Sequence, residues 1–283
     1  MQQKNAIALG TFDGVHIGHR AVLNLPDGYL KTAVTFAVPP KAVLLGNGGL
    51  ITTLEDKCRI LKNLGFSHIE LLEFQKVRNM SALSFLEFLK EKYNPDYISC
   101  GFNYKFGKNG EGNTEFLKKY CEENGITLKV LDCVTKDSVS VSSTVIRNML
   151  SNGEIGKANE LLSFPFSFES VVISGDKRGR TLGFPTINQK YPEQLVKVKF
   201  GVYKTLVEFD NKQYVGITNI GVRPTYKTDY VISETYISGF SGDLYGKNIR
   251  IIPLEFLREE RKFSSFDELK KQIELDLKNI KES

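Results

Sequence analysis

Residues 5–20, which decide the fold of the first half of the chain, are Asn-Ala-Ile-Ala-Leu-Gly-Thr-Phe-Asp-Gly-Val-His-Ile-Gly-His-Arg. The apolar run over residues 5–12 predicts a buried strand. Glycines at positions 10 and 14 predict a tight turn, and a helix-compatible segment begins near Val15. The free N–H groups at the start of a helix that follows a strand favour binding of a phosphate group.

Strands and helices alternate through the rest of the first half. We expect strands over 32–36, 69–74, 96–100 and 127–131, and helices over 53–64, 81–92 and 113–124. Two short helices are expected within residues 144–162. Strands that alternate with helices of about 10–15 residues predict a parallel sheet with helices on both faces. The first domain is therefore expected to be an α/β domain over residues 1–162.

After Pro165 the pattern changes to short apolar runs separated by turn residues. These runs span residues 168–174, 202–209, 214–219, 231–237 and 249–255, and their spacing predicts an antiparallel barrel. A final helix is predicted from the capping box Ser265-x-x-Glu268, with apolar positions 269, 273 and 277 on one stripe. The second domain is expected to span residues 163–283.

Composition excludes several classes of protein. The chain has 283 residues, 41% of them hydrophobic and 25% charged, which is ordinary globular usage. The net charge of +5 is spread evenly, with 19 Lys and Arg against 17 Asp and Glu in residues 1–160 and 19 against 16 in 161–283. A dedicated nucleic-acid binder concentrates its charge, so no nucleic-acid partner is expected.

Cysteine spacing and hydropathy predict where the protein works. The four cysteines lie far apart and form no C-x-x-C pair, so reduced thiols are expected rather than disulfides or structural zinc. The N-terminus has no secretory pattern, and no apolar run approaches the roughly 20 residues that span a bilayer. We therefore expect a soluble cytoplasmic protein that has no membrane partner.

Two of the chain's three histidines, His16 and His19, lie three residues apart. Positions i and i+3 share a helix face, so both imidazoles could contact one ligand. Imidazoles that donate to a triphosphate would stabilise charge on the α-phosphate during in-line displacement. We expect both to be catalytic, and the flanking phosphate-binding positions to be Gly10, Thr11, Phe12, Asp13, Gly14 and Gly18. The alternative is that they merely cap and pack the helix; zinc would need a third ligand.

A second phosphate-binding group is expected at Ser142, Ser143, Thr144 and Arg147. Three hydroxyls at a helix start, followed by an arginine, form a clamp for phosphate. A plain helix cap is the alternative.

Residues 175–188 combine glycines, three cations and a hydroxyl–amide pair. Glycines permit a tight loop, and cations suit phosphate; the predicted phosphate-binding positions are Gly175, Lys177, Arg178, Gly179, Arg180, Gly183 and Pro185. Thr186 and Asn188 could hold Mg²⁺ through oxygen atoms. A solvated basic turn is the alternative for the cations alone.

These segments resemble the bacterial bifunctional riboflavin kinase/FAD synthetases. Residues 10–20 are similar to the H-x-G-H element of nucleotidyltransferases, and residues 101–107 and 142–147 to the family's flavin and ATP elements. Residues 184–188 are similar to a riboflavin kinase element, and the likeness is densest over 171–263. The resemblance implies a Rossmann-like nucleotidyltransferase α/β domain with a parallel sheet, followed by an antiparallel β-barrel riboflavin kinase domain with a C-terminal helix.

The resemblance also implies two reactions and their residues. The barrel would convert riboflavin and ATP to FMN, with Glu234 as general base and Mg²⁺ as cofactor. The α/β domain would join FMN and ATP to give FAD and pyrophosphate, with Arg147 assisting the histidines. Flavin contacts would come from Asn103, Phe106, Arg223, Arg258 and Phe263. We expect a monomer or weak homo-oligomer.

One segment departs from the family pattern and leaves alternatives open. Residues 36–40, Phe-Ala-Val-Pro-Pro, carry no histidine where the family commonly has F-x-P-H-P. One alternative is therefore a riboflavin kinase whose amino-terminal domain is inactive or weak. Another is a non-catalytic flavin-binding sensor, which would form no product from riboflavin and ATP.

Overall fold

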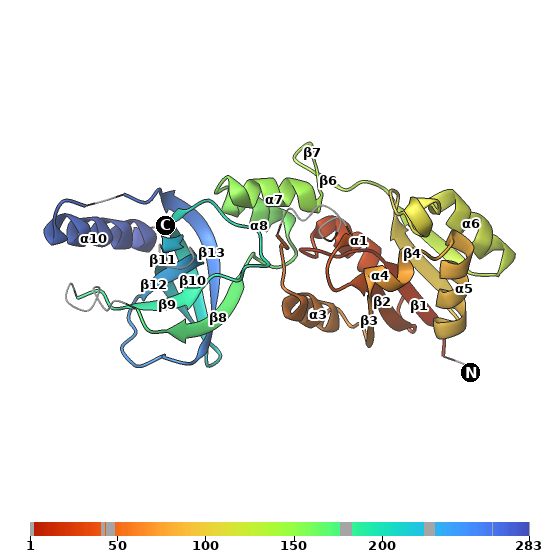
Figure 1. The fold of residues 1–283 in the computed structure, drawn as a ribbon, viewed down its shortest axis with the longest axis horizontal. Coiled ribbons are helices and arrows are strands. Elements are labelled where there is room, and N and C mark those ends of the chain that lie inside the picture. The colour runs from red at the N-terminus through yellow and green to blue at the C-terminus, as the bar shows by residue number, and fades with distance from the viewer. Residues whose placement is uncertain are drawn as a thin grey trace. The chain divides into compact units, whose positions relative to one another are not determined.

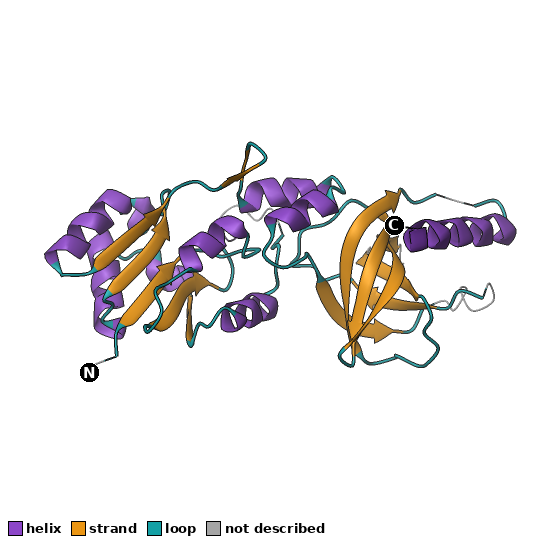
Figure 2. Cartoon of the chain, turned by 180° about the vertical axis from the view of Figure 1, so that it is seen from behind, coloured by secondary structure: helices purple, strands orange, loops and turns teal. Residues whose placement is uncertain are grey.

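The computed structural model describes residues 3–40, 43, 49–175, 183–223, 230–261 and 263–282. The chain divides into two compact units, residues 1–145 with 161–163, and residues 146–160 with 164–283. Helices and strands interleave in the first unit, whereas strands gather into a barrel in the second (Figure 2). The domain limits of 1–162 and 163–283 stay a prediction.

The first unit is built on a five-stranded parallel sheet of order β3-β2-β1-β4-β5 (Figure 1). Its strands are β1 (Asn5–Leu9), β2 (Leu30–Phe36), β3 (His68–Leu72), β4 (Tyr97–Gly101) and β5 (Thr127–Leu131). In β1, Ala8 pairs with Ala33 of β2 on one side and with Ser99 of β4 on the other. The chain proceeds outward from β1 in both directions, which makes the end of β1 a topological switch point where α/β folds bind ligands.

Helices cover both faces of this sheet, as predicted. They are α1 (Ile17–Leu23), α3 (Leu54–Asn63), α4 (Phe74–Val77), α5 (Ala82–Tyr93) and α6 (Thr114–Glu123); a 3-10 turn (Lys108–Gly110) and a hairpin of β6 (Thr135–Lys136) and β7 (Val139–Ser140) complete the unit. Ile7 and Leu9 of β1 pack with Leu86 of α5 and Leu117 of α6. Because side chains alternate along a strand, Ala8 faces the other side of the sheet, and α1 packs against β1, β4 and β5.

The second unit is the predicted antiparallel barrel, closed in the order β10-β11-β12-β9-β8-β13. Its strands are β8 (Phe168–Ile173), β9 (Thr186–Lys190), β10 (Gly201–Phe209), β11 (Lys212–Arg223), β12 (Tyr230–Ile237) and β13 (Asn248–Arg258). The sequence pattern did not predict β9, because its residues Thr-Ile-Asn-Gln-Lys lack apolar alternation. This strand forms because β12 and β8 pair with it on either side.

Three helices accompany the barrel: α7 (Ser143–Ser151), which begins in the first unit, α8 (Ile155–Leu161) and α10 (Phe266–Glu282). Leu277 of α10 packs against Val202 and Ile217. Arg258 of β13 donates from Nη2 and Nε to Asp276 Oδ2, at 2.9 and 3.1 Å. The Asp276 side chain is only 5% exposed, so this ion pair and the apolar contact together hold the C-terminal helix on the barrel.

The core of the first unit predicts a contrast along one helix. Leu86 of α5 is 1% exposed, whereas Leu83 on the same helix is 53% exposed. Leu86→Ala is expected to lower the free energy of unfolding by about 2–5 kcal/mol, because it leaves a cavity in a packed core. Chemical denaturation measures this, and Leu83→Ala serves as the control, with an expected change within about 0.5 kcal/mol. Equal effects would contradict the packing described for α5.

Candidate functional site

The turn after β1 contains two non-glycine residues in an unusual backbone conformation. Phe12 and Val15 have φ of 48° and 37°, in the left-handed region, and both are 0% exposed. A non-glycine residue held there costs on the order of 1–3 kcal/mol, and such strain is concentrated at functional sites. The intervening Gly14, with φ of 82°, adopts this region without a side-chain penalty.

Asp13 ties other segments to this turn. Its carboxylate accepts the backbone N–H groups of Ile51 at 2.9 Å and Thr52 at 3.3 Å. Its main-chain carbonyl accepts a hydrogen bond from the hydroxyl of Ser143 at 3.0 Å. The structure therefore brings the Ser142–Thr144 element to the turn after β1. Asp13 itself is 2% exposed and acts as a tether within the turn.

His16 and His19 lie against each other immediately beyond the turn. Their rings stack with centroids 3.5 Å apart and an interplanar angle of 17°. His16 is the N-cap residue of α1, and its Nδ1 accepts the backbone N–H of His19 at 3.2 Å. A neutral imidazole that accepts at Nδ1 carries its proton on Nε2, so that His16 can donate to a ligand through Nε2. A Cβ at Gly18 would lie 3.2 Å from the His16 ring.

Both histidines are uncharged at neutral pH. Burial lowers the pKa of His16 to about 4. Burial, followed by the proximity of His16 and Lys57, lowers the pKa of His19 well below its ordinary value. The Nδ1 atom of His19 is buried, and no hydrogen-bond partner for it lies among the described residues. The pair can therefore act as hydrogen-bond donors at this pH rather than as cations.

Lys57 of α3 is a residue of this site that sequence reasoning missed. It is 3% exposed, and its Nζ donates to the main-chain carbonyls of Phe36 and, at 3.4 Å, of Thr11. Burial lowers its pKa, whereas the nearby Asp13 and Cys58 act to raise it. A signal was present in the sequence, because position 57 falls beside positions 54, 58 and 61 on the apolar stripe of this helix.

The other predicted residues of the first half lie on two further segments. Ser142 Oγ accepts the backbone N–H of Val145 at 3.3 Å, so this hydroxyl caps α7, on which Arg147 follows one turn after Ser143. Asn103 is exposed and follows β4, the strand beside β1.

Phe106, a predicted flavin contact, lies in the core of the first unit. It is 6% exposed, and its ring packs against those of Tyr104 and Phe85, with centroids 5.6 and 5.7 Å away. The exposed ring of this segment is Phe102, which is 50% exposed. Phe102 was not among the predicted contacts, because the motif alone does not distinguish core from surface rings.

In the barrel, strand register aligns three polar residues in one row. Glu234 of β12 pairs with Asn219 of β11 on one side and with Asn188 of β9 on the other. The Oδ1 atoms of Asn188 and Asn219 are buried and have no hydrogen-bond partner among the described residues. Asn219 donates from Nδ2 to Glu260 at 2.8 Å. The carboxylate of Glu234 thus belongs to a row whose two amide oxygens can accept from, or coordinate, a ligand.

Glycine is required at one end of this row. A Cβ at Gly175 would lie 2.4 Å from the amide nitrogen of Asn188, so any larger residue would displace that side chain. Gly183 has φ of 83°, which favours glycine. Lys177, Arg178, Gly179 and Arg180 lie outside the described residues. Arg223 is the last residue of β11.

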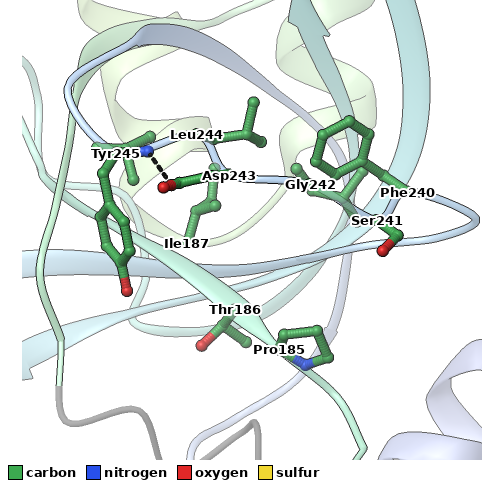
Figure 3. Close-up of a pocket in the computed structure, with 11 residues that line it drawn as sticks. Pro185, Thr186, Ile187, Phe240, Ser241, Gly242, Asp243, Leu244 and Tyr245 are labelled. Carbon is green, nitrogen blue, oxygen red and sulfur yellow. Dashed lines mark hydrogen bonds between the residues drawn. The ribbon is translucent and has the colours of Figure 1, made fainter.

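A cavity of about 320 Å³ opens at the start of β9 (Figure 3). Pro185, Thr186 and Ile187 face the loop of residues 240–245 across it. The loop is braced by the backbone N–H of Tyr245, which donates to Asp243 at 3.0 Å. Because Thr186 lines the cavity and Asn188 lies two residues further along β9, this strand connects the cavity to Glu234.

The predicted flavin contacts Arg258 and Phe263 lie together. The Arg258 guanidinium, already paired with Asp276, lies 5.9 Å from the centroid of the Phe263 ring. The Arg261 guanidinium lies 4.6 Å from the same ring. The Phe263 ring, shortly after β13, thus lies within 6 Å of two cations.

Within the described ranges, no three His, Cys, Asp or Glu side chains group into a metal site. None of the helices described is long and apolar enough to cross a membrane.

The two units match two known protein families. Residues 1–145 match the FAD synthetase family model, and residues 162–283 match the riboflavin kinase model. Bifunctional riboflavin kinase/FMN adenylyltransferases from Listeria monocytogenes and Bacillus subtilis are 35% and 33% identical to the chain. These matches cover 95% and 97% of this chain, and 89% and 91% of the relatives.

A solved structure has the same fold over nearly the whole chain. It is a protein from Streptococcus pneumoniae described as a macrolide-efflux protein, with a TM-score of 0.90 and 28% identity. The match covers 98% of this chain and 94% of that one. The efflux description belongs to that protein.

Fold and matches define a two-part transferase, in which a nucleotidyltransferase-type α/β unit precedes a kinase-type barrel. The chain belongs to the family of bifunctional riboflavin kinase/FMN adenylyltransferases. It is thus an enzyme of flavin cofactor biosynthesis.

The burial of His16 predicts a pH dependence of stability. Its pKa is about 4 in the folded chain and 6.5 ordinarily, so the unfolded chain takes up the proton first as the pH falls. The contribution to stability is therefore complete above pH 6.5 and is lost between pH 6.5 and about 4, to the extent of about 3 kcal/mol. An NMR titration of the ring protons measures this pKa directly.

The control for that titration is His16→Asn, which keeps a side-chain acceptor at the N-cap of α1. This variant is expected to show a weaker loss of stability with acid in pH-dependent denaturation. A His16 ring that titrates near 6.5 would contradict the buried, neutral state.

Proposed function

We propose that the barrel unit phosphorylates riboflavin with ATP and that the α/β unit then transfers AMP from a second ATP to FMN, releasing pyrophosphate. The observations that carry this proposal are the histidine pair of the first unit and the row of Asn219, Glu234 and Asn188 in the second. His16 and His19 stack at the switch point of the sheet, and Glu234 is aligned with Asn188 of β9, the strand on which Thr186 lines a cavity. Each site therefore supports one of the two reactions.

In the kinase reaction, Glu234 accepts the proton of the ribityl 5′-hydroxyl as its oxygen forms a bond to the γ-phosphorus of ATP. The bond from that phosphorus to the bridging oxygen breaks, and ADP leaves with the electron pair. Phosphoryl transfer depends mainly on positioning, so Glu234 acts by orienting the hydroxyl as well as by accepting its proton. The cavity at Thr186 takes the nucleotide, and a two-residue step of about 7 Å along β9 leads to Asn188 beside Glu234.

The residues at β9 fit a divalent cation. Asn188 has a buried, unpartnered Oδ1, and Thr186 lies on the same face of the strand with an exposed side chain. Oxygen ligands of this kind, together with phosphate oxygens, suit Mg²⁺. We propose that these two residues hold Mg²⁺, which when bound neutralises charge on the phosphates.

For the flavin of the kinase site, we propose Arg258, Phe263 and Arg223 as contacts. Phe263 offers an aromatic face for the ring system, and Arg258 is held in place by Asp276. Gly175, Lys177, Arg178, Gly179, Arg180, Gly183 and Pro185 are proposed to bind the ATP phosphates.

In the adenylyl transfer, an oxygen of the FMN phosphate forms a bond to the α-phosphorus of ATP. The bond to the β-phosphate oxygen breaks, and pyrophosphate leaves with the electron pair. His16 donates through Nε2–H to the α-phosphate oxygens, and the stacked His19 supports it. The turn of residues 10–14 with Gly18, the hydroxyls of Ser142–Thr144, and Arg147 bind the triphosphate. Asn103 is proposed to contact the flavin, and Phe106 is proposed to support that segment from the core.

We further propose that the enzyme works in the cytoplasm, as a monomer or weak homo-oligomer, with riboflavin, FMN and ATP as its partners and without nucleic acid. All four cysteines are free thiols, which agrees with a reducing compartment.

The purified chain, incubated with riboflavin, Mg²⁺ and ATP, is expected to form FMN first and FAD later. Chromatographic separation of the flavins over time measures both steps. FMN that accumulates without FAD, even when FMN is the starting substrate, would mean that the α/β unit is inactive. Absence of any product would favour the flavin-binding sensor.

Two substitutions should separate the reactions. Glu234→Gln is expected to lower riboflavin phosphorylation by about 10²–10⁴-fold while FAD formation from FMN persists. His19→Ala is expected to do the reverse, with a loss of about 10²–10³-fold in FAD formation. Steady-state rates of each half reaction measure this. Matched controls are Glu255→Gln and His68→Ala, both at exposed positions on strands. Loss of both activities in either variant would contradict the two-site model.

A further inference from the structure

One buried cation of the α/β unit has no place yet in the mechanism. Of the Lys and Arg residues that the structure describes, Lys57 is the one that is buried, at 3% exposure. Burying an ammonium group is unfavourable unless a specific interaction compensates. Its Nζ donates to the carbonyls of Phe36 and Thr11. The Phe36 carbonyl lies at the end of β2, and the Thr11 carbonyl lies two residues after the end of β1.

We propose that Lys57 is a positioning and electrostatic residue of adenylyl transfer: it holds the ends of β1 and β2 in place and supplies fixed positive charge to the triphosphate of ATP bound beside His16 and His19. The inference rests on the proposed function of this unit and assigns a role to a residue of the same site.

The charge is needed because the histidines do not provide it. Both are neutral at the pH at which the enzyme works, whereas a triphosphate is a polyanion. The charge of Lys57 acts at His19, since it lowers the pKa of that ring. Electrostatic effects are larger in a buried site than in water. In this proposal Lys57 therefore acts on the negative charge that develops on the α-phosphate during adenylyl transfer.

A purely structural role explains less. The ends of β1 and β2 are already joined, because Gly10 N–H donates to Val34 O at 3.2 Å and the Thr35 hydroxyl donates to Thr11 O at 2.9 Å. A neutral hydrogen-bond donor would suffice to add one more hydrogen bond between these strand ends. The titratable groups that face Lys57 are Asp13 from the turn and His19 from α1, with Cys58 on its own helix. The Asp13 carboxylate already accepts two backbone N–H groups.

The test compares Lys57→Met, which keeps the length of the side chain without its charge, with Lys62→Met at an exposed position of the same helix. Lys57→Met is expected to lower kcat for FAD formation from FMN by about 10²–10³-fold. The KM for FMN, riboflavin phosphorylation and all rates of Lys62→Met are expected to stay within about twofold. A folded Lys57→Met with wild-type kcat would overturn the inference.

The pH profile separates the electrostatic role from a structural one. Wild-type FAD formation should fall as the pH rises through the pKa of Lys57, which lies below 10.5. Lys57→Arg keeps its charge at that pH, so its remaining activity should show no such fall. Identical alkaline profiles in the two proteins would overturn the inference even if Lys57→Met fails to fold by circular dichroism. A wild-type chain that forms no FAD from FMN at any pH would instead refute the proposed function.

Discussion

The first unit depends on the pairing of β1 with strands on both sides. Ala8 pairs with Ala33 and with Ser99, so β1 lies at the centre of the sheet and the chain leaves it in opposite directions. This places the end of β1 where no neighbouring crossover covers it. The strained turn at Phe12 and Val15, the stacked histidines and the tether at Asp13 all follow directly from that strand end.

Burial at this strand end determines the electrostatics of the site. It removes the charge of both histidines at neutral pH, and in the proposed mechanism the stacked rings act through hydrogen-bond donation. Burial also places the ammonium group of Lys57 against two main-chain carbonyls, where we propose that it acts as the fixed charge of the site. In the proposed mechanism, hydrogen-bond donation and positive charge thus come from different residues of one site.

In the barrel, strand register positions the polar residues of the candidate site. Pairing of β12 with β11 and β9 aligns Glu234 with Asn219 and Asn188, and a shift of one residue would turn Glu234 to the opposite face. The short polar strand β9 then links this row to the cavity at Thr186. The ion pair of Arg258 with the buried Asp276 holds the C-terminal helix beside the same sheet.

The sequence by itself determined the parallel sheet with its helices, the antiparallel barrel and the family, because periodicity and short motifs are local properties of the chain. It also indicated the histidine pair and Glu234. Long-range contacts were needed to show that β9 is a strand, that Lys57 lies by the histidines, that Asn219 flanks Glu234, and that Phe106 is a core residue. These facts depend on contacts between residues far apart in the chain, and on burial that no single segment encodes.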